Sequence, residues 1–157
     1  MMDRIYHYYM DKEGRIWHEG TEMNDPRFAL LIQKNLQSTP EGLLAKCQGE
    51  KCFFQVEDVP YVVQDVALVK DEEGSLEQVD LIFPGGYMER LNPSTLFVSK
   101  ENVLYCSVRE GAFNARFSRN SYFRLIPFLA EDPEQHTYHL KMGGKRFAIG
   151  QPAALAS

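Results

Sequence analysis

The same succession of predicted elements occurs twice along this chain, and this repeat restricts the fold more than any single motif does. Each unit contains a strand, a Glu-Gly turn, a strand, a helix, a strand, a Gly-containing turn and a strand. The Glu13-Gly14 turn corresponds to Glu110-Gly111, and residues 49–53 correspond to 143–147. From the turn glycine to the last phenylalanine, the spacings are 39 and 36 residues. Strand-rich stretches with glycine turns can also resemble each other by chance, but a true repeat would place an interface between two like units, where ligand sites are common.

The hydrophobic pattern predicts an α+β fold of mostly antiparallel strands with two short helices, arranged as two structurally repeated halves. Aromatic and β-branched runs bounded by turn residues predict the strands, which cover 5–10, 15–19, 43–47, 51–56, 61–69, 76–83, 103–108, 112–118, 137–142 and 145–149. Amphipathic periodicity predicts helices over 26–37 and near 120–131. Pro127 lies inside the second helix, and because proline lacks an amide donor, we expect a kink or an early end there.

A break at Pro60 separates the two predicted units, because proline cannot occupy a central strand. We therefore expect an N-terminal repeat unit over 1–58, a C-terminal unit over 59–150 and a frayed tail over 151–157. A chain of 157 residues is long enough for one domain, or for two small halves that share a core.

The apolar segments predict a cytoplasmic protein without a membrane partner. No apolar run approaches the roughly 20 residues that a membrane helix needs, and the first residues lack the basic-then-apolar layout of a signal peptide. Cys47, Cys52 and Cys106 are an odd number of cysteines, which favours buried reduced thiols over a disulfide framework.

The charge distribution favours an anionic ligand in the second half of the chain. With 17 basic and 22 acidic residues, the formal net charge is −5, which disfavours a nucleic-acid partner. Residues 1–79 carry 8 basic and 15 acidic side chains, whereas residues 80–157 carry 9 and 7. Four of these later cations fall within sixteen residues, at Arg109, Arg116, Arg119 and Arg124. An anion would be attracted to this cluster.

Two of these arginines occupy positions suited to a phosphate or a carboxylate. On the predicted strand 112–118, Arg116 points away from the face that carries the phenylalanines, and Arg119 lies where the next helix begins, near free backbone amides. A guanidinium can bind either anion through two hydrogen bonds. An equally weighted alternative is that Arg116 and Arg119 pair with acids of the first half, including Glu57 or Asp58, and join the two halves.

The sequence favours neither a metal or cofactor site nor an enzyme. Cys47 and Cys52 lack the second Cys/His cluster of a closed zinc site, and His136 and His139 fall on opposite faces of a predicted strand. Neither a nucleophile elbow nor a phosphate loop occurs, since the lysine that such a loop needs does not follow Pro84-Gly85-Gly86. Glu57 and Asp58 could act as an acid–base pair, but adjacent carboxylates at a strand end more often stabilise a turn.

Several short motifs, taken in order, resemble one protein family. They are 11–20 (DKEGRIWHEG), 56–61 (VEDVPY), 108–111 (VREG), 115–119 (ARFSR) and 144–150 (GKRFAIG). Their order over most of residues 11–150 resembles the bacterial family called domain of unknown function 1285. This resemblance implies a duplicated α+β core, a C-terminal half similar to a pleckstrin-homology domain, and a nucleotide-type ligand site between the halves with a signalling role.

Carried over by position, the resemblance implies seven ligand-binding residues, which are Trp17, Glu57, Asp58, Pro60, Arg109, Arg116 and Arg119. The first hypothesis is therefore a non-enzymatic ligand-binding or signalling module for an anionic, nucleotide-like small molecule. The alternative is a protein-interaction adaptor, in which the same surface binds a protein partner or a second copy of the chain. A third hypothesis is an enzyme that uses the two carboxylates.

Overall fold

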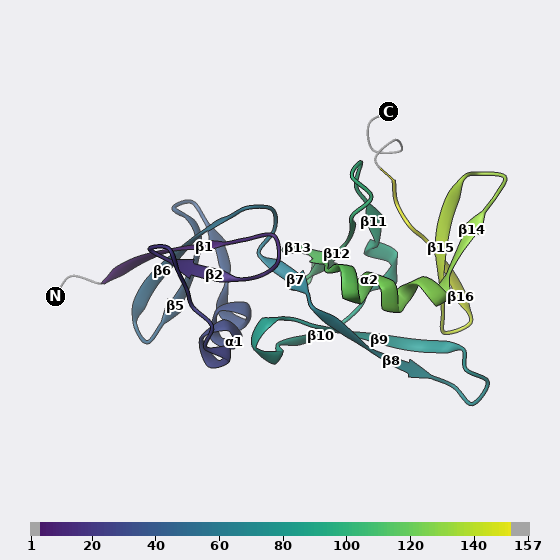
Figure 1. Ribbon diagram of the computed structural model, residues 1–157, viewed down its shortest axis with the longest axis horizontal. Coiled ribbons are helices and arrows are strands. Elements are labelled where there is room, and N and C mark those ends of the chain that lie inside the picture. Colours follow the sequence, from purple (N-terminus) through teal and green to yellow (C-terminus); the bar gives the residue numbers. More distant parts are fainter. Residues whose placement is uncertain (1–3, 152–157) are drawn as a thin grey trace.

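The computed structural model describes residues 4–151, in which four β-sheets and two short α-helices form an elongated molecule (Figure 1). The predicted α+β class with mostly antiparallel strands is confirmed. All but the first residue of the predicted tail, 151–157, lies outside the described residues. No described helix is both long and apolar enough to cross a membrane.

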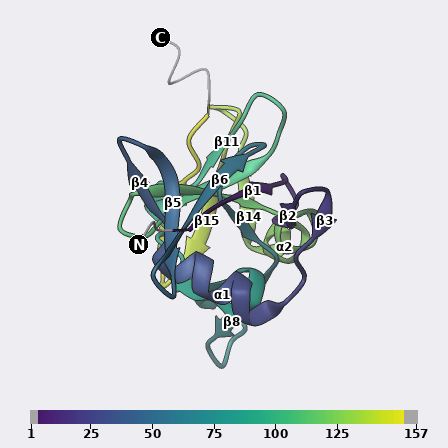
Figure 2. The same ribbon diagram turned by 90° about the vertical axis from the view of Figure 1, so that its left-hand side faces the viewer.

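The N-terminal half is built on a six-stranded sheet with the order β3-β2-β1-β6-β5-β4. Its strands are β1 (Ile5–Met10), β2 (Ile16–His18), β3 (Thr21–Glu22), β4 (Gln37–Thr39), β5 (Gly42–Cys47) and β6 (Glu50–Val56). Neighbours are antiparallel except for β1 and β6, which run parallel from Ile5↔Lys51 to Met10↔Val56. The helix α1 (Pro26–Asn35) packs against one face of this sheet (Figures 1 and 2).

The C-terminal half contains three smaller sheets. Their orders are β11-β12-β13-β7, β10-β9-β8 and β14-β15-β16. The strands are β7 (Tyr61–Val63), β8 (Asp65–Lys70), β9 (Leu76–Ile82), β10 (Met88–Arg90), β11 (Phe97–Val98), β12 (Leu104–Val108), β13 (Phe113–Phe117), β14 (Leu129–Asp132), β15 (Thr137–Met142) and β16 (Lys145–Ala148). The helix α2 (Arg119–Leu125) and three single turns of 3-10 helix, η1 (Pro84–Gly86), η2 (Pro93–Thr95) and η3 (Ile126–Phe128), connect them.

A side-chain cap fixes the start of each helix, and Pro127 fixes the end of the second. Asp25 caps α1 by accepting from the amide of Arg27 at 2.9 Å, and Pro26 is its first residue. Ser118 caps α2 in the same way, accepting from the amide of Ser121 at 3.2 Å. The predicted early end at Pro127 is confirmed, because α2 stops at Leu125 and a 3-10 turn follows.

Several predicted boundaries are wrong. The expected helix 26–37 ends at Asn35, because β4 begins at Gln37, and the helix expected near 120–131 gives way to β14 at Leu129. The single strand expected over 61–69 is divided at Gln64 into β7 and β8. The two pieces belong to different sheets, β7 parallel to β13 and β8 antiparallel to β9.

The repeat is present in the order of the elements, since both halves contain a hairpin, a helix and a second hairpin. Gly14 and Gly111 each have a φ of +87° and donate an amide hydrogen bond to the carbonyl three residues earlier, at 3.1 and 3.2 Å. The strand pairing differs between the halves. In the first half the second hairpin joins the sheet of the first, whereas β15 and β16 form a separate sheet with β14.

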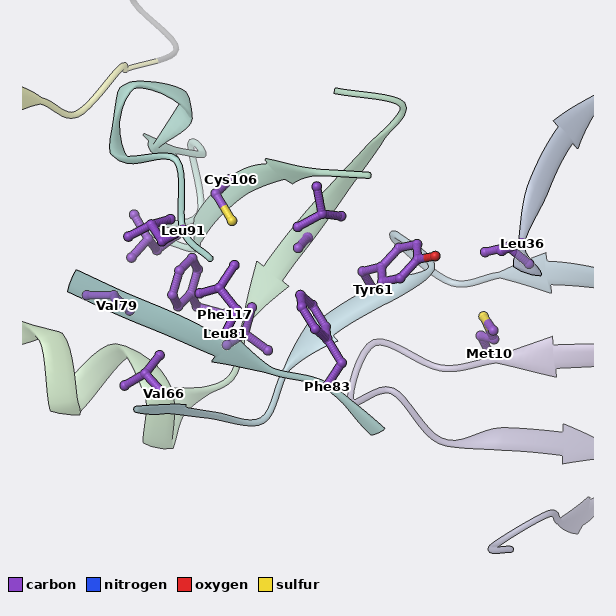
Figure 3. Close-up of a cluster of buried hydrophobic side chains, with 14 of the residues drawn as sticks. Met10, Leu36, Tyr61, Val66, Val79, Leu81, Phe83, Leu91, Cys106 and Phe117 are labelled. Carbon is purple, nitrogen blue, oxygen red and sulfur yellow. The ribbon is translucent and has the colours of Figure 1, made fainter. Parts of the chain in front are cut away.

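One hydrophobic core runs through both halves (Figure 3). Met10 and Leu36 belong to the N-terminal half, and Leu81 and Phe117 to the C-terminal half; all four are buried. Tyr61 lies between the two groups, and its hydroxyl oxygen faces the side of Leu36 (Figure 3). The halves therefore fold as neighbours that share apolar contacts.

The three cysteines are buried free thiols, as predicted. Burial raises the pKa of Cys52 and of Cys106 to about 12. Because the thiolate is the reactive form, these side chains act as small apolar groups in the core.

Candidate functional site

The predicted site residues do not form one cluster. Asp58 and Arg116 meet at the junction of the two halves, and Arg109 lies at the end of α1. Arg119 lines a groove between the halves, and Trp17 lies on the N-terminal sheet in a different groove.

Asp58, Tyr105 and Arg116 form a half-buried junction between the halves. The Arg116 guanidinium donates to Asp58 Oδ2 at 2.9 Å, and the Tyr105 hydroxyl donates to the same oxygen at 2.7 Å. The alternative that Arg116 pairs with an acid of the first half is therefore confirmed. Burial, together with the hydrogen bond to Asp58, raises the pKa of Tyr105 to about 12.

We expect Tyr105→Phe to make stability less sensitive to alkaline pH. Tyr105 binds its proton more tightly in the folded chain, so its stabilising effect is complete below pH 10 and is lost as pH rises towards about 12. The variant keeps the ring that stacks on Phe97 but loses about 1 kcal/mol of hydrogen bonding at neutral pH. Urea unfolding from pH 8 to pH 11.5 measures both effects, and an unchanged alkaline slope would contradict this assignment.

Glu57 and Pro60 have structural contacts on either side of this junction. Glu57 Oε1 accepts from the backbone amide of Lys12 at 3.1 Å and from the Tyr9 hydroxyl at 3.4 Å. The carbonyl of Pro60 accepts from Gln33 Nε2 at 3.2 Å. Glu57 and Asp58 thus have separate partners, one in the β1–β2 turn and one in the C-terminal half.

Arg109 joins the β12–β13 turn to the end of α1. Its guanidinium donates to the carbonyl of Gln33 at 3.1 Å and to the Tyr61 hydroxyl at 2.7 Å. Its backbone amide donates to both carboxylate oxygens of Glu89, at 3.0 and 3.1 Å. A cation is favourable near the C-terminal end of a helix, where the dipole is negative. Arg109 is therefore a structural link between the halves.

A groove of about 500 Å³ opens beside this junction, between the β1–β2 turn and the segment that joins β13 to α2. Gly14 brings that turn close to β7, since a Cβ on Gly14 would lie 3.0 Å from Val62 Cβ. We call this space the seam groove; its charged and aromatic lining consists of Lys12, Glu13, Arg116, Phe117, Arg119 and Tyr122.

The seam groove carries more positive than negative charge. Its one acid, Glu13, is paired with Arg15 at 2.7 Å. Within residues 4–151, neither the ammonium of Lys12 nor the guanidinium of Arg119 makes an ion pair, although Arg119 lies over the Phe123 ring at 5.4 Å. The groove is therefore positively charged, although the chain as a whole has a net charge of −5.

Lys12 and Tyr122 are groove residues that the sequence did not single out. Lys12 immediately precedes the Glu13-Gly14 turn, and its place beside this repeated turn is the one sequence feature that could have marked Lys12 as a site residue. Tyr122 falls within the helix that the sequence predicts near 120–131, where its ring counts only as an apolar position. Lys12 could not be placed beside Arg119 without knowing how the turn packs on the other half, whereas Tyr122 follows Arg119 by three residues on α2, a spacing that makes them neighbours.

Among the described residues, 4–151, no group of three or more His, Cys, Asp and Glu side chains is arranged to hold a metal ion. His139, Asp132 and Arg146 form a polar cluster on the last sheet. Buried His139 contacts Asp132 at 3.0 Å through Nδ1 and accepts from Arg146 Nε at 3.1 Å. Both ring nitrogens are thus engaged within the protein.

Two solved structures are similar to this chain over most of its length. One is a DUF1285 family protein from Silicibacter pomeroyi DSS-3, with 17% identity, a TM-score of 0.69, and coverage of 99% of this chain and 87% of that one. The other is a DUF1285 family protein from Shewanella baltica OS155, with 16% identity, a TM-score of 0.59, and coverage of 76% and 90%. No family model matches the sequence, and no curated protein matches it.

Proposed function

From the fold that this chain shares with two DUF1285 family proteins, which confirms the resemblance that its motifs indicated, we propose that it is a non-enzymatic binding module. Its ligand is an anionic small molecule of nucleotide type, bound in the seam groove. The observation that carries the proposal is the pair of cations, Lys12 and Arg119, that line the groove without an acidic partner among residues 4–151.

The dimensions and lining of the seam groove support a nucleotide-sized ligand. Small-molecule pockets usually have volumes of about 300 to 1,000 Å³, and the groove has about 500 Å³. Lys12 and Arg119 would bind the phosphate groups from opposite walls, since they come from the two different halves. Tyr122 offers an aromatic ring on which a base can stack.

The position of the groove supports a signalling role. A ligand held by Lys12 and Arg119 contacts both halves at once, so it favours one relative orientation of the halves over others. The Asp58–Arg116 pair joins the same two halves next to the ligand. Binding would therefore stabilise the junction, and a partner protein could detect the change.

We expect Arg119→Ala and Lys12→Ala each to weaken ATP binding about tenfold, because each removes one charge-assisted contact to phosphate. Isothermal titration at low salt measures the affinity. Arg27→Ala is the matched control, since Arg27 is 92% exposed, pairs with Asp25 at the start of α1 and is absent from the groove lining. The control should bind as the parent protein does.

A thermal-shift panel of ATP, cyclic nucleotides, dinucleotides and small carboxylic acids should identify the class of ligand that binds most tightly. A ligand at about one hundred times its dissociation constant adds roughly 2.7 kcal/mol to stability, which raises the melting temperature by several degrees. Equal affinity in the parent, Arg119→Ala and Lys12→Ala would place binding elsewhere. A panel with no response at all would favour the protein-interaction adaptor.

A further inference from the structure

A second and larger groove, of about 960 Å³, lies on the N-terminal sheet. Tyr8 of β1 contacts Phe28 of α1 with ring centroids 5.3 Å apart, so the strand residues on either side of it face away from the helix. The groove is lined by the rings of His7 and Tyr9 from β1, Trp17 from β2 and Phe53 from β6. We call it the aromatic groove.

The rings of the aromatic groove are held in place without a ligand. His7 and Phe53 are stacked with centroids 5.7 Å apart and an interplanar angle of 20°. The Trp17 indole donates to Asp11 Oδ2 at 3.0 Å, and the Arg15 guanidinium lies 5.7 Å from its ring centre. A surface whose rings are already ordered loses little conformational entropy when it binds a partner.

The charge of the aromatic groove is opposite to that of the seam groove. Its lining includes the carboxylates of Asp11, Glu19 and Glu41 and contains neither lysine nor arginine. Asp11 is saturated by four hydrogen bonds, and Glu41 has only a long contact with Lys51, at 3.7 Å. Aromatic faces and carboxylates both attract cations. The lining therefore fits a cationic ligand with an apolar body.

The two less engaged acids lie at opposite ends of the groove. Glu19 is in the β2–β3 turn and Glu41 in the β4–β5 turn, and the strands β2, β1, β6 and β5 lie between them in this order. With about 4.8 Å between neighbouring strands, the distance from β2 to β5 is about 14 Å. An extended peptide of four to five residues covers this length at about 3.3 Å per residue.

We propose that the aromatic groove binds an extended basic peptide segment of a partner protein, with one cationic side chain near Glu19 and another near Glu41. The residues between the two cations lie across the aromatic floor. Two separated acids and a long apolar floor fit a chain with two separated charges better than a single small cation. This site is separate from the seam groove, so the two bind ligands of opposite charge.

The test is a titration of the protein with a pentapeptide, acetyl-Arg-Pro-Leu-Pro-Arg-amide, followed by the fluorescence of Trp17, the one tryptophan of the chain. The peptide should change the Trp17 emission, and this change should saturate as the peptide concentration rises. Glu19→Gln and Glu41→Gln should each weaken binding about threefold at low salt, in the range of partly exposed ion pairs. Phe53→Ser should weaken it more, because the stack with His7 is lost.

Glu72→Gln is the control for net charge, since Glu72 is an exposed acid in the β8–β9 turn of the other half. It should bind the peptide as the parent does. The proposal is overturned if the peptide leaves Trp17 emission unchanged, or if the control weakens binding as much as the groove variants do. Tetramethylammonium that binds as tightly as the peptide would overturn it too. ATP binding by Glu19→Gln tests the seam groove separately and should be unchanged.

Discussion

Gly85→Ala is expected to lower the free energy of unfolding by about 3 kcal/mol or more. Gly85, in η1, lies directly against the backbone of α1. A Cβ at this position would be 2.4 Å from the Leu30 nitrogen and 2.6 Å from the Pro26 oxygen. The backbone of a helix cannot move aside locally, so α1 and the C-terminal half would have to separate. The φ of +77° adds strain for any residue with a side chain.

Gly86→Ala is the matched control for this effect. Gly86 has a φ of +83°, yet a Cβ there would have no atom within 4 Å. It therefore tests the backbone strain alone, which costs about 1 kcal/mol. Urea unfolding of both variants measures the difference. Equal losses would show that η1 does not pack against α1 as described.

Arg109→Met is the second large effect, with an expected loss of about 3 kcal/mol. The variant keeps an apolar stem of similar length but removes the donors that satisfy the Gln33 carbonyl and the Tyr61 hydroxyl. Both acceptors lie in the core between the halves; the Tyr61 hydroxyl still donates to the Gln33 carbonyl, but each group loses a hydrogen bond from a charged donor, which contributes about 1.5 to 3 kcal/mol. The cation at the end of α1 is lost as well.

Arg27→Met is the comparison for Arg109→Met. The ion pair between Arg27 and Asp25 in the parent protein is exposed, and such pairs contribute about 0 to 1 kcal/mol to the free energy of unfolding. Chemical unfolding followed by Trp17 fluorescence and by far-ultraviolet circular dichroism measures both variants. Because Trp17 reports on the N-terminal half, the two probes should diverge in Arg109→Met if Arg109 couples the halves. Similar small losses in the two variants would contradict that role.

Local patterns in the sequence predicted most of the elements, because their causes are local. The aromatic run of β1, the glycine turns and the end of α2 before Pro127 each depend on residues close together in the chain. The division at Gln64 could not be predicted in this way. Most of residues 61–69 are apolar, and five of the nine are valine or tyrosine, which favour strands. What separates β7 from β8 is the parallel partner of β7, which lies about fifty residues later in β13.

Of the residues that line the seam groove, sequence patterns singled out Arg116 and Arg119 but neither Lys12 nor Tyr122, and they did not predict how these residues are arranged. Charge clustering drew attention to the arginines. On the sequence alone, we give equal weight to Arg116 and Arg119 as ligand residues and as partners for acids of the first half, including Glu57 or Asp58. Which arginine meets which acid depends on contacts between the halves, and these follow from the packing of the β1–β2 turn. The same contacts place Arg119 in the seam groove, whereas the pairing of β2 with β1 within the N-terminal sheet places Trp17 in the aromatic groove.

The most direct test of the proposed seam-groove ligand site is a titration with ATP followed by nuclear magnetic resonance of the arginine and lysine side chains. The account predicts that the Arg119 Nε and Lys12 Nζ signals shift together and saturate at one dissociation constant, while Arg27 stays unchanged. Shifts confined to other cations, or no saturable shift at Arg119, would contradict the seam groove as the ligand site.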